Sequence, residues 1–359
     1  MVKITCGDLC CGGGGWIAQL QDFITPIWSI DNDPAVVAVH AQNYKSHIIC
    51  SDIAQVDPRS LPKVDVLFVS PPCQQWSAAR SKKLPARVDA EIGEIVCRYI
   101  EVLTLKFVFL ENVRGYVRSK SLQQIENVLY TLGYWVDRQI VDAADFGVPQ
   151  NRLRLILRAV RNSFTPALPA QEKTRGWYEA IADLIPELPT TQLAPWQLKR
   201  LPPQLKQSFL IDSKNADPQG KPTVRLVSQP AFAVCASSHK GFPKAVLVER
   251  TGARSGGLKT RSAHEPAWTI RCAITTDGRG GNRHSFLNAL LDGQVLNLNT
   301  RALARLQSFP DWYALPSSTV VAGRIIGNAV PPVLARKIVV STIFPLLDYK
   351  AMHYHPSKC

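Results

Sequence analysis

The sequence predicts an α/β protein with a mostly parallel sheet, followed by a smaller, irregular and basic region. In the first 160 or so residues, short apolar runs alternate with amphipathic stretches, a pattern typical of a parallel sheet connected by helices. Residues 64–69 (VDVLFV) and 107–110 (FVFL) are apolar on both faces, as expected for strands at the centre of such a sheet. Between residues 163 and 203, frequent prolines end this pattern.

The elements follow in a regular order. Strands are predicted at residues 2–6, 24–30, 64–69, 107–110, 135–141 and 153–160. The apolar run HIIC at 47–50 is also read as a strand, which an acidic residue follows. Helices are predicted between them at 15–22, 34–43, 89–103 and 122–132, the last ending before Gly133. Two later helices are predicted at 301–308 and 331–343. This order favours a Rossmann-like domain.

Composition narrows the class of protein. The 46% hydrophobic and 19% charged content is that of an ordinary globular protein. No apolar run reaches the roughly 18–20 residues of a membrane span, and the N-terminus lacks a secretory pattern. The nine cysteines show no zinc-type spacing, so we expect reduced thiols, no metal, no membrane partner and a cytoplasmic location.

The positive charge is confined to the later part of the chain. Residues 1–150 carry a net charge of −2, whereas residues 151–359 carry +16. Such an excess predicts a polyanionic partner such as nucleic acid, and a solubilising surface is the alternative.

A glycine-rich turn follows the first predicted strand, at Asp8-Leu-Cys-Cys-Gly12-Gly13-Gly14-Gly15. Its backbone N–H groups and the helix start predict a site for electronegative ligand groups. Because no Lys-Ser/Thr follows, it is not a phosphate loop; a dinucleotide or S-adenosylmethionine would fit equally well. Asp31 and Asp52 end the next strands, where a carboxylate can accept ribose hydroxyls or an adenine amino group, or can cap a helix.

Two further strand ends carry reactive side chains. Ser70-Pro-Pro-Cys73 follows the strand at 64–69, and Glu111-Asn112-Val113 follows the strand at 107–110. Together they would offer a thiol nucleophile and a general acid, although a small buried cysteine in a turn has the same local pattern. Alternate residues of the next strand, Gln150, Arg152 and Arg154, share one face and could donate to a polar ring or to carboxylates. A solvated edge strand is the alternative for these three.

In their order along the chain, these blocks resemble those of cytosine-C5 DNA methyltransferases. The resemblance includes two later blocks, Arg301-Ala-Leu-Ala-Arg305-Leu-Gln307-Ser-Phe-Pro310-Asp and Gly327-Asn328-Ala-Val-Pro331-Pro332. It covers roughly residues 3–160 and 298–343. Six blocks in the family's order are poorly explained by chance.

The resemblance implies a mechanism. Cys73 would add to C6 of cytosine, and C5 would then take the methyl group of S-adenosylmethionine, leaving S-adenosylhomocysteine. Glu111 would hold N3 and the exocyclic amine, Arg154 would bind O2, and Arg152 would brace the active-site loops. The target base must leave the duplex, so base flipping is implied.

The resemblance also assigns the cofactor site. The methionine portion would lie by Asp8, Leu9 and the Gly12–Gly15 turn, the ribose by Asp31, and the adenine by Asp52 and Ile53. Further cofactor-binding residues would be Pro72, Asn328 and Val330.

The late block at Gly327–Pro332 implies that the chain returns to the catalytic domain. We therefore expect a discontinuous catalytic domain at 1–164 and 301–345, a target-recognition domain at 165–300, and a tail at 346–359.

The implied partner is duplex DNA, bound by a monomer associated with the nucleoid, and a cognate restriction endonuclease could accompany it. Substrate-binding residues are expected near Cys73, on the strand that opens at Gln150, and in the basic target-recognition domain: Gln74, Ser77, Gln150, Arg254, Arg261, Arg279 and Arg283. The segment after Cys73, with Arg80, Lys82, Lys83 and Arg87, is expected to close over the flipped base.

The sequence departs from the family at three positions. Cys10 stands where an aromatic residue normally touches the cofactor, and Trp16 is the candidate to replace it. Ser70 stands in place of the usual glycine, as in the related tRNA methyltransferases, and Trp76 in place of phenylalanine.

The alternatives to a DNA methyltransferase are an RNA cytosine-C5 methyltransferase, an inactive DNA-binding relative, and a nicotinamide-dependent enzyme. The last leaves the Cys73 and Glu111 blocks unexplained.

Overall fold

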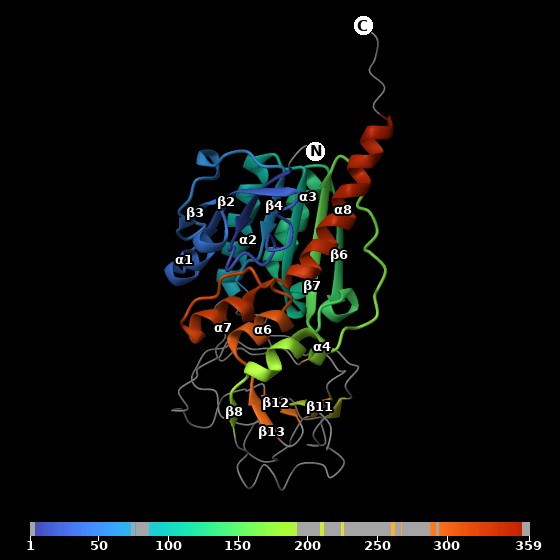
Figure 1. Cartoon of the computed structure of the whole chain (residues 1–359). Helices are drawn as coiled ribbons and strands as arrows, with labels where there is room; N and C mark the ends of the chain where they lie inside the picture. Colours follow the sequence, from blue (N-terminus) through green and yellow to red (C-terminus); the bar gives the residue numbers. More distant parts are fainter. Residues whose placement is uncertain are drawn as a thin grey trace.

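A seven-stranded sheet forms the centre of the structure (Figure 1). The computed structural model describes residues 4–72, 76, 86–191, 209–211, 224–225, 260–262, 267, 288–291 and 294–353. The strand order is β3-β2-β1-β4-β5-β7-β6, and only β7 runs antiparallel to its neighbours. The strands are β1 Ile4–Leu9, β2 Ile24–Asp31, β3 His47–Cys50, β4 Val66–Val69, β5 Phe107–Val113, β6 Tyr134–Asp142 and β7 Leu153–Arg161. The predicted mostly parallel α/β fold is confirmed.

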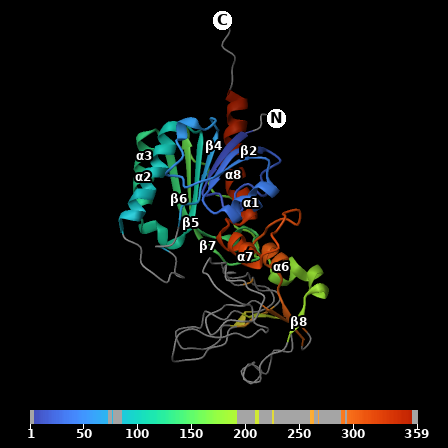
Figure 2. The same ribbon diagram turned by 90° about the vertical axis from the view of Figure 1, so that its left-hand side faces the viewer.

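Helices cover both faces of this sheet (Figure 2). On one face lie α2 (Ala86–Leu103) and α3 (Lys120–Thr131); on the other lie α1 (Pro34–Asn43) and α8 (Pro332–His353). Alternate strand residues supply the two cores, because successive side chains of a strand point to opposite faces. Phe68 and Phe109 belong to the core under α8, whereas Leu67 and Val108 belong to the core under α2 and α3.

Two strands extend further than predicted. Asp8 and Leu9 lie inside β1, paired with β2 and β4, and not in the turn after it. The Glu111-Asn112-Val113 segment likewise belongs to β5, because the antiparallel strand β7 pairs with it up to Arg154. The candidate carboxyl groups are therefore held by sheet hydrogen bonds, which fix their positions more firmly than a loop would.

The predicted helix at residues 15–22 is wrong. The chain there makes a series of turns in which hydrogen bonds from Ile17 and Leu20 span three residues, so no continuous helical ladder forms. Just before these residues, Gly12 and Gly14 have φ of +53° and +77°, values outside the right-handed helical region. Trp16 to Ala18 and Leu20 are all buried, so packing on every side, and not one apolar stripe, determines the path.

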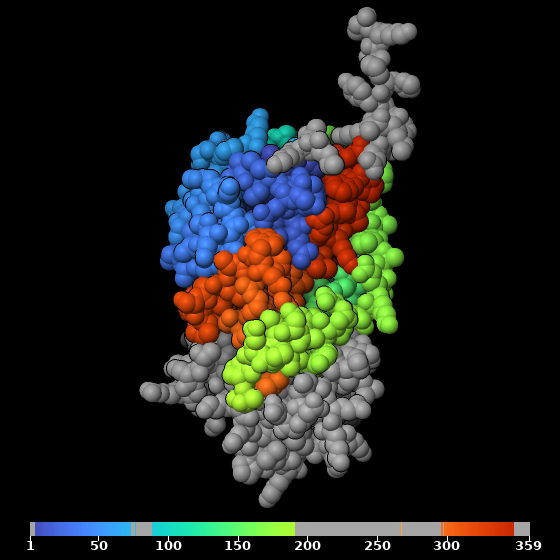
Figure 3. Space-filling model, in the orientation of Figure 1, coloured from blue at the N-terminus to red at the C-terminus, as the bar shows by residue number. Residues whose placement is uncertain are grey.

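The chain returns to the sheet domain after residue 298. Helices α6 (Thr300–Leu306), α7 (Thr319–Asn328) and α8 share a core with the N-terminal residues, and Figure 3 shows this orange-to-red segment directly against the blue one. The helix α7 was not predicted. Within the described chain, Thr319–Leu347 contains an 18-residue segment of mean hydropathy 1.5, long and apolar enough to span a membrane, yet 56% of that segment is buried. The helices α7 and α8 thus contribute largely to the core.

Smaller elements complete the described chain. A second, six-stranded sheet has the order β10-β11-β9-β12-β13-β8. Its strands are short: β8 Thr190–Thr191, β9 Phe209–Ile211, β10 Val224–Arg225, β11 Thr260–Ser262, β12 Asn288–Leu291 and β13 Gln294–Asn297. The helix α4 (Trp177–Ile181) precedes this sheet, and 3₁₀ turns lie at Pro58–Ser60 (η1), Arg114–Arg118 (η2), Ala143–Phe146 (η3) and Ala182–Glu187 (η4).

Candidate active site

The glycine turn after β1 is open on one side and closely packed on the other. A Cβ on Gly12 would meet nothing within 4 Å, whereas a Cβ on Gly15 would lie 2.5 Å from the Val330 carbonyl oxygen. The Gly12 N–H donates to Asp31 Oδ2 at 2.9 Å, which joins the turn to the end of β2. Gly15 thus fits the turn against the returning segment, and Gly12 leaves open space beside the Asp31 carboxylate.

Asp8 provides an observation that fits a cofactor here. Its side chain is buried, and among the described residues neither carboxyl oxygen has a hydrogen-bond partner. Burial, followed by the nearby Asp31 charge, raises the pKa of Asp8 well above its usual range. A buried acceptor of this kind is costly unless a donor reaches it. The amino group of S-adenosylmethionine would be such a donor, so these residues fit the implied cofactor.

The proposed adenine end of the site is more exposed. Asp52 is exposed, and its Oδ1 accepts from the Ala54 N–H at 2.9 Å, so it caps the following turn. Ile53 is buried, and its carbonyl accepts the Tyr99 hydroxyl of α2 at 2.8 Å. Asp52 was predicted either to bind the cofactor or to cap a helix, and in this structure it makes a capping contact.

Trp16, the candidate to replace the aromatic residue that the family has at position 10, lies in the core. Its ring is 2% exposed and stacks on Phe68, with centroids 5.0 Å apart. Its indole N–H donates to Ser70 Oγ at 3.0 Å. Trp16 therefore supports the loop after β4 from within the core.

His40 was missed by the sequence reasoning. This buried residue of α1 lies with Nδ1 3.2 Å from the Gly12 carbonyl oxygen and Nε2 3.3 Å from Ser46 Oγ. Burial is the main cause that lowers the pKa of His40 to about 4. No local motif marks this histidine, because its partner lies 28 positions earlier in the chain.

The His40 pKa predicts acid sensitivity. Above pH 6.5 the ring is neutral in both folded and unfolded chains, so it makes no difference to stability. As pH falls from about 6.5 to 4, the unfolded chain binds the proton first, and the folded state loses up to about 3 kcal/mol. Urea unfolding between pH 7 and 4.5 should show a shallower loss of stability for His40→Gln than for the unmodified protein. Parallel curves would contradict this.

The ends of β4 and β5 are in direct contact. Asn112 Nδ2 donates to the Pro71 carbonyl at 3.0 Å, which joins the Glu111 segment to the turn that precedes Cys73. Glu111 is buried, and its Oε1 lies 2.8 Å from Arg154 Nε of β7. The predicted carboxyl, guanidinium and proline turn are therefore adjacent.

Gln150, Arg152 and Arg154 are all buried, so the solvated edge-strand alternative is wrong for them. Gln150 Nε2 donates to the Leu306 carbonyl at 3.3 Å. Arg152 donates to the carbonyls of Gly327 and Ala329 at 3.1 and 2.8 Å. Gln150 and Arg152 were predicted on the strand but precede β7, which begins at Leu153. Arg152 thus joins the start of β7 to the late Gly327-Asn328 block, where Asn328 is exposed and Val330 is buried.

Arg152→Met should destabilise the fold by about 3 kcal/mol, because a buried carbonyl loses its donor and the site loses a tightly packed guanidinium. Urea unfolding measures the effect. Arg138→Met, which breaks a partly exposed pair with Glu126, is the matched control and should cost less than about 1 kcal/mol. Equal urea midpoints of unfolding for the two variants would contradict the structural role assigned to Arg152.

Several predicted site residues lie outside the described part of the chain: Cys73, Gln74, Ser77, Arg254, Arg279 and Arg283. Arg261 belongs to β11, where it pairs with Leu210 of β9 and Arg225 of β10. Pro72 is exposed at the turn, and Leu9 is buried in β1.

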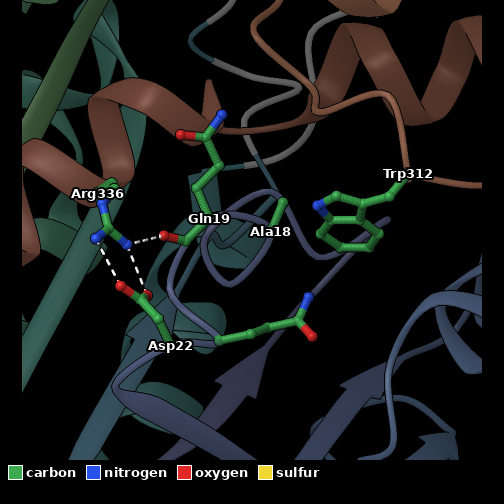
Figure 4. Close-up of a pocket in the computed structure, with 6 residues that line it drawn as sticks. Ala18, Gln19, Asp22, Trp312 and Arg336 are labelled. Carbon is green, nitrogen blue, oxygen red and sulfur yellow. Dashed lines mark hydrogen bonds and ion pairs between the residues drawn. The ribbon is translucent and has the colours of Figure 1, made fainter.

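A separate surface hollow contains none of these residues (Figure 4). Arg336 forms two hydrogen bonds to the Asp22 carboxylate across it, at 2.7 and 2.6 Å. Its lining is otherwise Ala18, Gln19, Gln21 and Trp312. Among the described residues that line it, the one cation is already paired, so they offer no reactive group.

The family model of C-5 cytosine-specific DNA methylases matches residues 4–343. The chain belongs to this family. It is therefore a DNA cytosine-C5 methyltransferase, a class of enzyme that depends on S-adenosylmethionine. The strand order differs from that of dinucleotide-binding sheets, which run 3-2-1-4-5-6, because here the antiparallel β7 lies between β5 and β6.

Relatives extend over nearly the whole methylase. The Type II methyltransferase M.AplI of Arthrospira platensis is 28% identical, over 91% of this chain and 81% of its own. The Type II methyltransferase M.XorII of Xanthomonas oryzae pv. oryzae is 25% identical, over 92% and 82%. Among solved structures, the S. pombe Dnmt2 methyltransferase matches with a TM-score of 0.57 at 13% identity, over 98% of this chain and 100% of its own. This last likeness concerns the fold.

Proposed function

We propose that this methyltransferase acts on a specific sequence in duplex DNA, on a cytosine flipped out of the helix, through a covalent bond from Cys73 to C6. The observation that carries the proposal is the contact between the ends of β4 and β5. The Asn112–Pro71 hydrogen bond and the Glu111–Arg154 pair bring a carboxyl group beside the turn that leads to Cys73.

Each residue would have a distinct role in the reaction. The Cys73 thiolate adds to C6 while Glu111, held by Arg154, supplies a proton to N3, so electron density moves to C5. The cofactor supplies an electrophilic methyl group. Loss of the C5 proton then expels the thiolate and restores the aromatic ring. Arg154 would also donate to O2 of the base, and Arg152 would hold the late block in place.

The proposed cofactor contacts follow the sheet edge. Asp8 would accept from the amino group, Asp31 from the ribose, and the Asp52–Ile53 turn would receive the adenine, with Pro72, Asn328 and Val330 completing the site. Residues 165–300 would recognise the target, since the +16 charge of residues 151–359 suits a DNA backbone. The Type II relatives support, by analogy, a partner restriction endonuclease.

The test is direct. The purified protein is incubated with tritiated S-adenosylmethionine and either unmethylated duplex DNA or tRNA, and label is expected in the DNA. Label confined to tRNA would overturn the proposed substrate. Bisulfite sequencing of DNA from cells that express the protein would then give the target sequence, and methylation without a sequence preference would overturn the proposed specificity.

A further inference from the structure

Two tryptophans flank the loop that carries the proposed nucleophile. Cys73 lies three positions after Ser70 and three before Trp76. At one end, the Trp16 indole N–H donates to Ser70 Oγ at 3.0 Å. At the other end, the Trp76 indole N–H donates to Asp89 Oδ1 at 3.2 Å. We call these two hydrogen bonds the loop anchors.

The Asp89 anchor is part of a buried network. Asp89 is 6% exposed, and its carboxylate also accepts from the Lys120 N–H at 2.7 Å and from Ser121 Oγ at 2.8 Å. These are the first residues of α3, so one carboxylate joins Trp76 to the start of that helix. A buried carboxylate with several donors is held in one position, which makes it a rigid acceptor.

Packing around Trp76 agrees with this role. A Cβ on Gly115 would lie 2.4 Å from the Trp76 carbonyl oxygen. Gly115 belongs to η2, which directly follows the Glu111 strand. The glycine therefore allows Trp76 to lie against the same segment that positions Glu111.

The Ser70 anchor is equally well supported. The Trp16 ring is fixed by stacking on Phe68 of β4, so its N–H has a defined direction. The Ser70 N–H donates to the Leu9 carbonyl at 3.2 Å, and Asn112 holds the next residue, Pro71. The loop thus leaves β4 with three successive constraints.

Both anchors coincide with departures from the family pattern. Glycine at position 70 could not accept from Trp16, and phenylalanine at position 76 could not donate to Asp89. We infer that Ser70 and Trp76 are positioning residues, which fix the ends of the Cys73 loop before DNA binds. This inference rests on the proposed role of Cys73.

The test compares Trp76→Phe and Ser70→Ala with Trp28→Phe. Trp28 is fully buried, whereas Trp76 is half-buried, and the Trp28 indole donates to the Pro62 carbonyl at 2.9 Å, so this control loses an indole hydrogen bond away from the site. We expect kcat to fall about tenfold in each loop variant with KM for DNA within about twofold, and kcat to be unchanged in Trp28→Phe. The double variant Trp16→Phe/Ser70→Ala should be no worse than Ser70→Ala, because both remove the same bond.

Amide hydrogen exchange of the peptide covering residues 70–76 provides a readout that needs no methylation. Exchange should be about tenfold faster in Trp76→Phe and Ser70→Ala and unchanged in Trp28→Phe. If the unmodified protein failed to methylate DNA, the proposed function would fall, and exchange alone would still decide the inference. Loop variants that match Trp28→Phe in kcat, or that leave exchange at 70–76 unchanged, would overturn it.

Discussion

Replacing Cys73 with alanine should abolish methyl transfer to DNA while leaving the protein folded. Without the thiolate, C5 of cytosine stays a poor nucleophile, and loss of a nucleophile typically costs on the order of 10⁴-fold or more in kcat. Incorporation of tritiated methyl groups into duplex DNA measures the loss. Binding of S-adenosylmethionine, measured by calorimetry, should change little, because the proposed cofactor contacts lie mainly on other residues.

The cysteines within the described residues allow a direct comparison with Cys73. Burial raises the pKa of Cys6, Cys10, Cys11 and Cys97, so these side chains stay protonated and unreactive. Cys50 is exposed, so Cys50→Ala is the matched control and should keep full activity. Duplex DNA with 5-fluorocytosine at the target should form a covalent complex with the unmodified protein and with Cys50→Ala, but not with Cys73→Ala. A complex that survives Cys73→Ala would place the nucleophile elsewhere.

Sequence reasoning recovered the sheet because its central strands are uninterrupted apolar runs. Phe107–Leu110 can be buried on both faces only at the centre of a covered sheet, and β5 lies between β4 and β7. The carboxyl and guanidinium groups of the candidate site were found for a related reason. Glu111 follows that apolar run directly, and Arg154 lies near the start of β7, where Leu155 to Val160 are also buried.

The missed features depend on contacts between distant parts of the chain. Helix α7 contains two glycines and several β-branched residues, which have low helix propensity, and its Ile325 instead packs at the glycine turn. The Gly12 partner of His40 and the Lys120 partner of Asp89 lie about 30 positions away in the chain, so no local spacing marks these contacts. The sequence shows Trp76 as a departure from the family, but it does not show that Asp89 accepts its hydrogen bond.

Glu111→Gln should lower kcat by about 10²–10⁴-fold, the usual contribution of a positioned general acid. Glutamine has nearly the same shape and can still accept from Arg154, 2.8 Å away in the unmodified protein, so the fold and DNA binding should be retained. It cannot deliver a proton to N3 as Cys73 adds to C6. A charge that builds on the ring without this proton raises the barrier to addition itself.

Kinetics can separate this role from a structural one. In single-turnover experiments with saturating DNA, formation of the covalent complex on 5-fluorocytosine DNA should slow by the same factor as kcat, because the affected step precedes methyl transfer. Glu126→Gln, which removes the negative charge from the partly exposed pair with Arg138, should change neither rate. If Glu111→Gln formed the covalent complex at the normal rate and slowed only later steps, Glu111 would act after addition of the thiolate. The proximity of thiol and carboxyl at the ends of β4 and β5 would then need a different explanation.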